Sequence, residues 1–65
     1  MIMYYGFTTY DETVKDEMRK YLKENNIYYE LSSCYDGWHF EIKMLEEQMK
    51  NVNDFLMNIN GKRFG

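Results

Sequence analysis

A chain of 65 residues forms one small domain, residues 1–65, that hides only about 60% of the surface exposed in its unfolded state. Its single cysteine excludes an internal disulfide, the lack of a Cys/His cluster excludes a structural zinc site, and 18% aromatic residues argue against disorder. The formal net charge is −3, and residues 1–60 carry eleven acidic against six basic side chains, which disfavours binding to nucleic acid.

The first expected element is a strand over residues 1–7, MIMYYGF, because these residues are mostly aromatic or large and apolar. Its two alternating sets of side chains are both apolar, so the pattern does not decide which set faces the core. A strand that is apolar on both sides is usually central in a sheet or lies at an interface.

A helix is expected next, starting at a capping box in which the Thr9 hydroxyl and the Glu12 carboxylate bind free backbone amides. Apolar side chains recur along this helix at helical spacing: Tyr10, Val14, Met18, Tyr21 and Leu22. Asn25-Asn26 ends the helix, because asparagine tolerates the left-handed conformation found at many helix ends.

Residues 27–44 alternate in polarity on both sides of Asp36-Gly37, a pair that favours a two-residue hairpin turn with positive φ. Pairing outward from this turn gives one apolar face and one polar face. On the polar face the expected pairs are Cys34 opposite His39, Ser32 opposite Glu41 and Glu30 opposite Lys43.

Residues 45–60 have the spacing of a second helix, with apolar side chains at Leu45, Met49, Val52, Leu56 and Ile59. Gly61 is expected to end this helix. No Ser, Thr, Asp or Asn lies between Lys43 and Glu46 to cap its start. A competing interpretation therefore begins the helix near Gly37, with Asp36 as the cap, but we prefer the hairpin.

The expected element order is β-α-β-β-α, an α+β fold. A helix that joins two strands, followed by a hairpin and a second helix, gives a three-stranded sheet with both helices on one face. This is a ferredoxin-like pattern that lacks the last strand, and such an analogy carries no function by itself.

The face that the helices leave open and an unpaired strand edge are the expected contact surfaces. The residues expected to bind a partner carry aromatic rings or charges: Tyr4, Tyr28, Glu30, Tyr35, Trp38, His39 and Glu41. The alternative is that the tyrosines are ordinary strand formers on the solvent side.

Enzymatic activity is not expected. Cys34 and His39 would be close enough for the imidazole to activate the thiol, with Glu41 to orient it, but an open sheet face offers no cleft that excludes water. The glycines stand singly, so no phosphate-binding loop is expected, and neither is a metal or a cofactor.

These properties predict a binding protein that acts by protein–protein contact, as a homodimer or bound to its target. No motif matches a named family. In its size and its richness in Asn, Lys, Tyr, Ile and Met, the chain resembles the small inhibitors that bacteriophages carry against host defences, including anti-CRISPR proteins. The alternatives are a dimer that sequesters a small nucleotide and an antitoxin-like regulator.

The expected location is the cytoplasm, which would be the host cytoplasm for a phage-encoded protein. The start of the chain has no basic leader and no cleavage pattern, and no apolar run reaches the length of a membrane span.

Overall fold

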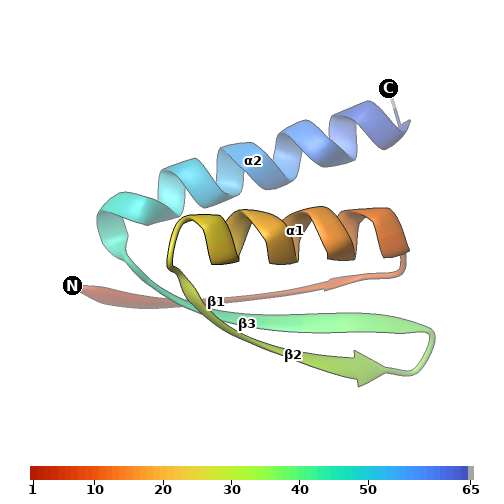
Figure 1. Ribbon diagram of the computed structural model, residues 1–65, viewed down its shortest axis with the longest axis horizontal. Coiled ribbons are helices and arrows are strands. Elements are labelled where there is room, and N and C mark those ends of the chain that lie inside the picture. Colours follow the sequence, from red (N-terminus) through yellow and green to blue (C-terminus); the bar gives the residue numbers. More distant parts are fainter. Residues whose placement is uncertain (65) are drawn as a thin grey trace.

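The computed structural model describes the backbone of residues 1–64 and the side chains of residues 1–59. Its elements are β1 (Ile2–Thr9), α1 (Glu12–Glu24), β2 (Tyr28–Cys34), β3 (Gly37–Leu45) and α2 (Glu46–Phe64). The strands form one antiparallel sheet in the order β1-β3-β2, and both helices cover the same face of it (Figure 1). The predicted β-α-β-β-α fold is confirmed.

β1 runs two residues further than expected and lies at an edge of the sheet, not at its centre. It pairs with β3 over eight successive residues, from Ile2 opposite Leu45 to Thr9 opposite Trp38. Its odd-numbered side chains face the helices and are half-buried, whereas its even-numbered side chains are exposed. The central position belongs to β3, which therefore carries the most deeply buried residues of the sheet.

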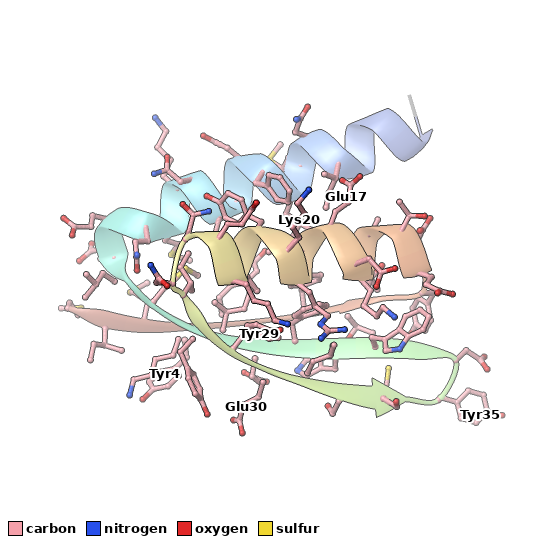
Figure 2. All side chains as sticks on the ribbon, in the orientation of Figure 1. Tyr4, Glu17, Lys20, Tyr29, Glu30 and Tyr35 are labelled. Atoms are coloured by element: carbon pink, nitrogen blue, oxygen red, sulfur yellow. The ribbon has the colours of Figure 1, made fainter. Side chains whose placement is uncertain are left out.

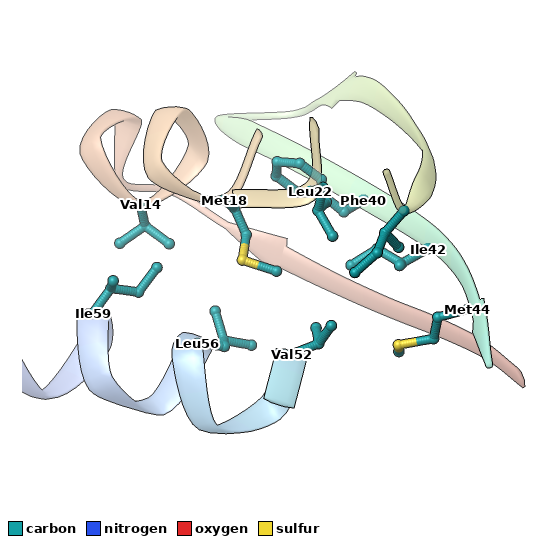
Figure 3. Close-up of a cluster of buried hydrophobic side chains, with 10 residues drawn as sticks. Val14, Met18, Leu22, Phe40, Ile42, Met44, Val52, Leu56 and Ile59 are labelled. Carbon is teal, nitrogen blue, oxygen red and sulfur yellow. The ribbon is translucent and has the colours of Figure 1, made fainter. Parts of the chain in front are cut away.

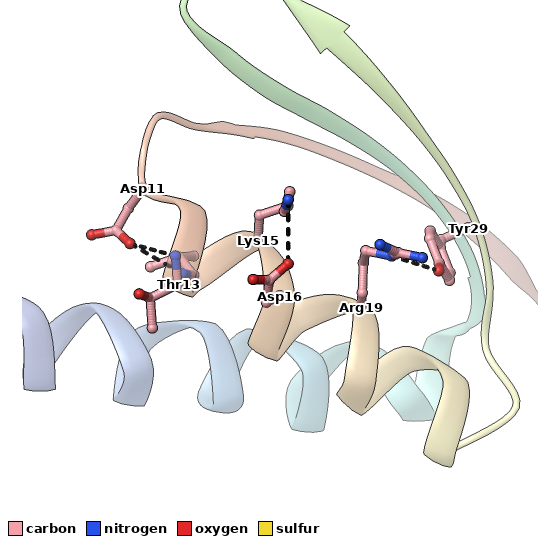
Figure 4. Close-up of polar contacts among 7 residues, drawn as sticks. Asp11, Thr13, Lys15, Asp16, Arg19 and Tyr29 are labelled. Atoms are coloured by element: carbon pink, nitrogen blue, oxygen red, sulfur yellow. Dashed lines mark hydrogen bonds and ion pairs between the residues drawn. The ribbon is translucent and has the colours of Figure 1, made fainter.

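The start of α1 differs from the predicted capping box. Asp11 is the N-cap, and its carboxylate accepts hydrogen bonds from the amides of Thr13 and Val14, at 2.8 and 3.2 Å (Figure 4). The hydroxyl oxygen of Thr9, two residues before this N-cap, accepts a hydrogen bond from the amide of Asp11. The predicted end of the helix is confirmed, because Asn26 has a φ of 55° just after it.

The hairpin is confirmed, and the competing helix from Gly37 is excluded, but the expected turn is wrong. Cys34 pairs with Gly37, so Tyr35 and Asp36 form the turn, and neither has a positive φ. Each β2 residue opposes a β3 residue two positions earlier than expected. The observed pairs on the open side are therefore Cys34 with Gly37, Ser32 with His39, Glu30 with Glu41 and Tyr28 with Lys43.

Position 37 requires a glycine, because its backbone lies too close to the end of β1 to leave room for a Cβ atom. A Cβ atom at this position would overlap the carbonyl oxygen of Thr9 and would come within 2.8 Å of Cδ1 of Tyr10. This close approach occurs at the first residue of β3, and the turn forms from the two residues before it. The glycine thus allows two backbones to meet and does not supply a left-handed turn conformation.

α2 begins directly after β3, and two unexpected groups satisfy its first amides. The side-chain oxygen Oε1 of Gln48 accepts from the amide of Leu45 at 2.9 Å, which is one half of a capping box. The carbonyl of Met1 accepts from the amide of Glu46 at 3.0 Å. The helix also continues past Gly61 to Phe64, so its predicted end was wrong.

The core lies between the helices and the sheet (Figure 3). Its buried side chains come from both helices, from β3 and from the residue before β2: Val14, Met18, Leu22, Ile27, Phe40, Ile42, Met44, Val52, Leu56 and Ile59. Phe40 is fully buried and stacks on Phe7, with 5.0 Å between ring centroids. The helical stripes predicted from spacing are confirmed, apart from exposed Tyr10 and Leu45 at their ends.

Candidate functional site

The face of the sheet opposite the helices, called the open face below, carries every second side chain of each strand. Its members are Ile2, Tyr4, Gly6 and Thr8 of β1, His39, Glu41, Lys43 and Leu45 of β3, and Tyr28, Glu30, Ser32 and Cys34 of β2. The observed register arranges them in rows across the sheet. Figure 2 shows Tyr4 and Glu30 on this side, below the sheet and away from both helices.

One row is Tyr4–Lys43–Tyr28, called the aromatic row below. Lys43 of the central strand lies opposite Tyr4 on one side and opposite Tyr28 on the other. The two tyrosines are 71% and 60% exposed. Neighbouring strands lie about 4.8 Å apart, so the lysine stem rises between two rings. Among the described side chains, Lys43 has no ion-pair partner.

The aromatic row borders a shallow hollow of about 650 Å³ at the end of the sheet. Ile2 and Leu45, which pair with each other and are both exposed, line this hollow together with the aromatic row. The exposed apolar side chains are thus contiguous. A contiguous apolar patch with a polar border is a common mark of a binding surface.

The next row is Gly6–Glu41–Glu30, called the acidic row below. Glu30 lies directly opposite Glu41, where an opposite-charge pair with Lys43 was expected. Like charges in this position destabilise a sheet. Gly6 leaves room for the carboxylate, because a Cβ atom at Gly6 would lie 3.1 Å from Oε1 of Glu41. The row therefore presents two carboxylates and no cation.

The third row contains a chain of hydrogen bonds through His39. Its Nδ1 lies 2.9 Å from the hydroxyl of Thr8, and its Nε2 lies 2.8 Å from Oε1 of Glu41. Both imidazole nitrogens are therefore engaged. The predicted pairing of Cys34 with His39 is wrong, since Cys34 lies opposite Gly37.

The order hydroxyl, imidazole, carboxylate also occurs in the catalytic triads of hydrolases. In those sites a closed pocket and oxyanion donors surround the nucleophile. Here the side chains of His39 and Glu41 are 33% and 56% exposed, so water reaches the groups directly. We interpret the hydrogen bonds from Thr8 through His39 to Glu41 as a surface network that fixes the orientation of the Glu41 side chain. Within the described part of the chain, no group of three or more His, Cys, Asp or Glu side chains could hold a metal ion.

The structure divides the predicted partner-binding residues among three places. Tyr4, Tyr28, Glu30, His39 and Glu41 lie together on the open face. Tyr35 lies at the tip of the hairpin and is 99% exposed (Figure 2). Trp38 faces the helices, where Nζ of Lys15 lies 4.6 Å from the centre of its ring. The sequence prediction missed Thr8 and Leu45, whose places on the open face depend on pairing with distant strands.

The side of α1 next to β2 offers a different kind of surface. Nζ of Lys15 forms an ion pair with Asp16 at 3.2 Å, and Nε of Arg19 donates to the hydroxyl of Tyr29 at 3.4 Å (Figure 4). The hydrogen bond with Tyr29 raises the pKa of Arg19, which stays charged. Acidic and basic groups are interleaved on this helix, so it does not present one sign of charge to a partner.

Comparison of the chain with protein-family models, with curated proteins and with solved structures found no match. The open face is therefore the basis for assigning a function. Neither helix, over the part of the chain that the structure describes, is long and apolar enough to cross a membrane.

Proposed function

We propose that the protein is a non-enzymatic binding protein that docks on another protein through its open face. The supporting observation is the contiguous exposed patch formed by the aromatic row with Ile2 and Leu45. Tyrosines are enriched among the residues that dominate binding at protein interfaces, where they bury much area and lose little side-chain freedom.

The acidic row defines the polar part of this docking surface. Glu30 and Glu41 repel each other in the free protein, and an arginine or lysine of the partner would remove that repulsion. Adjacent rows on one face lie about 7 Å apart along the strands. A fitting partner therefore presents apolar side chains with a basic side chain about 7 Å away.

We extend the proposal to the biological class of the protein. A small acidic domain rich in Asn, Lys, Tyr, Ile and Met is typical of inhibitors that bacteriophages use against host defences, such as anti-CRISPR proteins. Such an inhibitor acts in the host cytoplasm by covering a functional surface of its target. The proposal includes a homodimer as the active form, since a domain of this size gains stability from added buried area.

A second candidate function is the sequestration of a small nucleotide, and the aromatic row supports it. Two tyrosine rings beside one lysine can stack on a base and attract a phosphate. The acidic row opposes this function, because two carboxylates about 7 Å away repel the phosphate. We therefore favour the protein partner.

A pull-down from a bacterial lysate tests the proposal. The tagged wild-type protein is expected to retain one defined polypeptide, and a variant with Tyr28→Ala and Leu45→Ala is expected to lose it. Met57→Ala is the control, because Met57 is an exposed apolar side chain of α2, on the side of the sheet away from the open face. Retention by the double variant would contradict the proposal, and a bound molecule that absorbs like a nucleotide would favour the second candidate.

A further inference from the structure

β1 is an edge strand that lacks the features that usually protect an edge from pairing. Its sequence, IMYYGFTT, contains no charged residue and no proline. Its eight successive pairs with β3 contain no bulge. Natural edge strands are commonly short, charged, bulged or covered, because an unprotected edge pairs with other strands. The other edge strand, β2, carries Glu30 near its middle.

The hydrogen bonding shows which groups of β1 face outward. The amide of Glu46 binds the carbonyl of Met1, so these two residues form a hydrogen-bonded pair at the start of the β1–β3 ladder. Such pairs alternate along an antiparallel ladder. The odd-numbered residues of β1 therefore bond to β3, and the even-numbered residues direct their amides and carbonyls to the free edge. These residues are Ile2, Tyr4, Gly6 and Thr8.

We propose that this edge pairs with β1 of a second copy of the chain, antiparallel, to form one continuous sheet across the dimer. A two-fold axis at Tyr5 places Tyr4 opposite the partner's Gly6 and Ile2 opposite the partner's Thr8. Each of these residues has its backbone groups directed to the edge, so both pairs form hydrogen bonds in this register. The Tyr4 ring would cover the glycine, an arrangement that stabilises glycine in sheets.

The side chains of the helix-covered face also match in this register. Tyr5 lies opposite the partner's Tyr5, and Met3 lies opposite the partner's Phe7. All three are half-buried, and Tyr5 and Phe7 pack against the core of the single chain, so the second copy would complete their burial. No charged group meets another across the axis, since β1 has none. A strand from an unrelated partner would need to reproduce this self-complementarity.

This inference rests on the homodimer in the proposed function and adds its interface. Pairing at β1 would join two open faces into one surface, with the aromatic rows of the two subunits on the same side of the continuous sheet. Docking of the target is a separate property, because Tyr28 and Leu45 can bind it in a monomer.

Sedimentation velocity over a wide range of concentrations tests the interface. The wild type is expected to form a dimer, and Tyr4→Lys is expected to weaken it by roughly tenfold or more, since it places a charge at the paired edge. Tyr28→Lys is the matched control. Tyr28 lies in the same row and is similarly exposed, but it belongs to β2, the other edge strand. The Tyr28→Lys variant should therefore dimerise like the wild type.

Disulfide trapping tests the register. With Cys34→Ser as background, Tyr5→Cys should cross-link to its own copy, because directly opposite Cα atoms lie about 4.5 to 5.5 Å apart, within the range that a disulfide spans. Ile2→Cys is the control, since the two copies of residue 2 would be about 20 Å apart. Equal cross-linking of both variants would overturn this register.

The outcomes separate the two proposals. A dimer that resists Tyr4→Lys would overturn the β1 interface and keep the homodimer. A wild-type chain that stays monomeric at every concentration would overturn both the interface and the homodimer. In either case the pull-down with the Tyr28 and Leu45 variant still decides whether the open face binds a target.

Discussion

The two faces of the sheet are built from the same strands and yet have opposite properties. Along β3, Phe40, Ile42 and Met44 are buried under the helices, while Glu41 and Lys43 between them face solvent. The helix-covered face holds the domain together, and the open face contributes little to its stability. Substitutions on the open face should therefore test the proposed docking without unfolding the domain.

The largest expected effect comes from the centre of the helix-covered face. Phe40→Ala should lower the free energy of unfolding by about 3 to 5 kcal/mol, because it removes a fully buried ring that stacks on Phe7. Urea denaturation followed by circular dichroism measures this change. His39→Ala, one residue away on the open face, should lower it by less than about 1.5 kcal/mol. Equal losses would show that the two faces are not separable.

The two glycines of the sheet should respond differently to alanine. Gly37→Ala should destabilise the fold by about 1 to 3 kcal/mol, because its Cβ atom meets the backbone of Thr9. Gly6→Ala should change stability by less than about 1 kcal/mol, because its Cβ atom would meet the end of the Glu41 side chain and not backbone, so a small shift of that carboxylate relieves the contact. Thermal unfolding of both variants measures the difference. Similar melting temperatures would contradict the close-approach role of Gly37.

Substitutions at the start of α1 should have a smaller effect on the free energy of unfolding. Asp11→Ala should lower the free energy of unfolding by about 1 kcal/mol, since its carboxylate caps two helix amides. Glu12→Ala should have a smaller effect, because Asp11, and not the predicted box of Thr9 with Glu12, caps this helix. Denaturant titration compares the two variants. A larger loss for Glu12→Ala would favour the capping box.

The smallest expected change is an increase in the free energy of unfolding. Glu30→Gln removes one charge from the acidic row and should raise the free energy of unfolding by about 0.2 to 0.5 kcal/mol. The same variant should bind a basic partner less tightly in the pull-down. A variant that loses stability and keeps its partner would show that the acidic row is not part of the docking surface.

Local patterns in the sequence are sufficient to predict most of the fold. The helical spacing of Val14, Met18 and Leu22 and the alternation on both sides of Asp36-Gly37 each lie within one element or one hairpin. Hydrophobic burial alone then places the helices on one face of the sheet. These features do not depend on distant residues, so they survive in the structure.

The errors in the hairpin register and at the start of α2 have one common cause, which is dependence on distant parts of the chain. A shift of two residues leaves every β2 side chain on its expected face, so polarity cannot distinguish the two registers. In the observed register Gly37 begins β3 and lies against the carbonyl of Thr9, a contact that needs β1 to be in place. The hydrogen bond from Glu46 to Met1 and the hydrogen bond between His39 and Thr8 also join residues that are distant in sequence.

Leu45 connects the sheet with the helix layer, because it is the last residue of β3 and precedes α2 directly. Its side chain lines the hollow beside the aromatic row, and its amide binds Gln48 at the first turn of α2, with no loop between strand and helix. A partner bound at the hollow would therefore lie against the junction of β3 and α2.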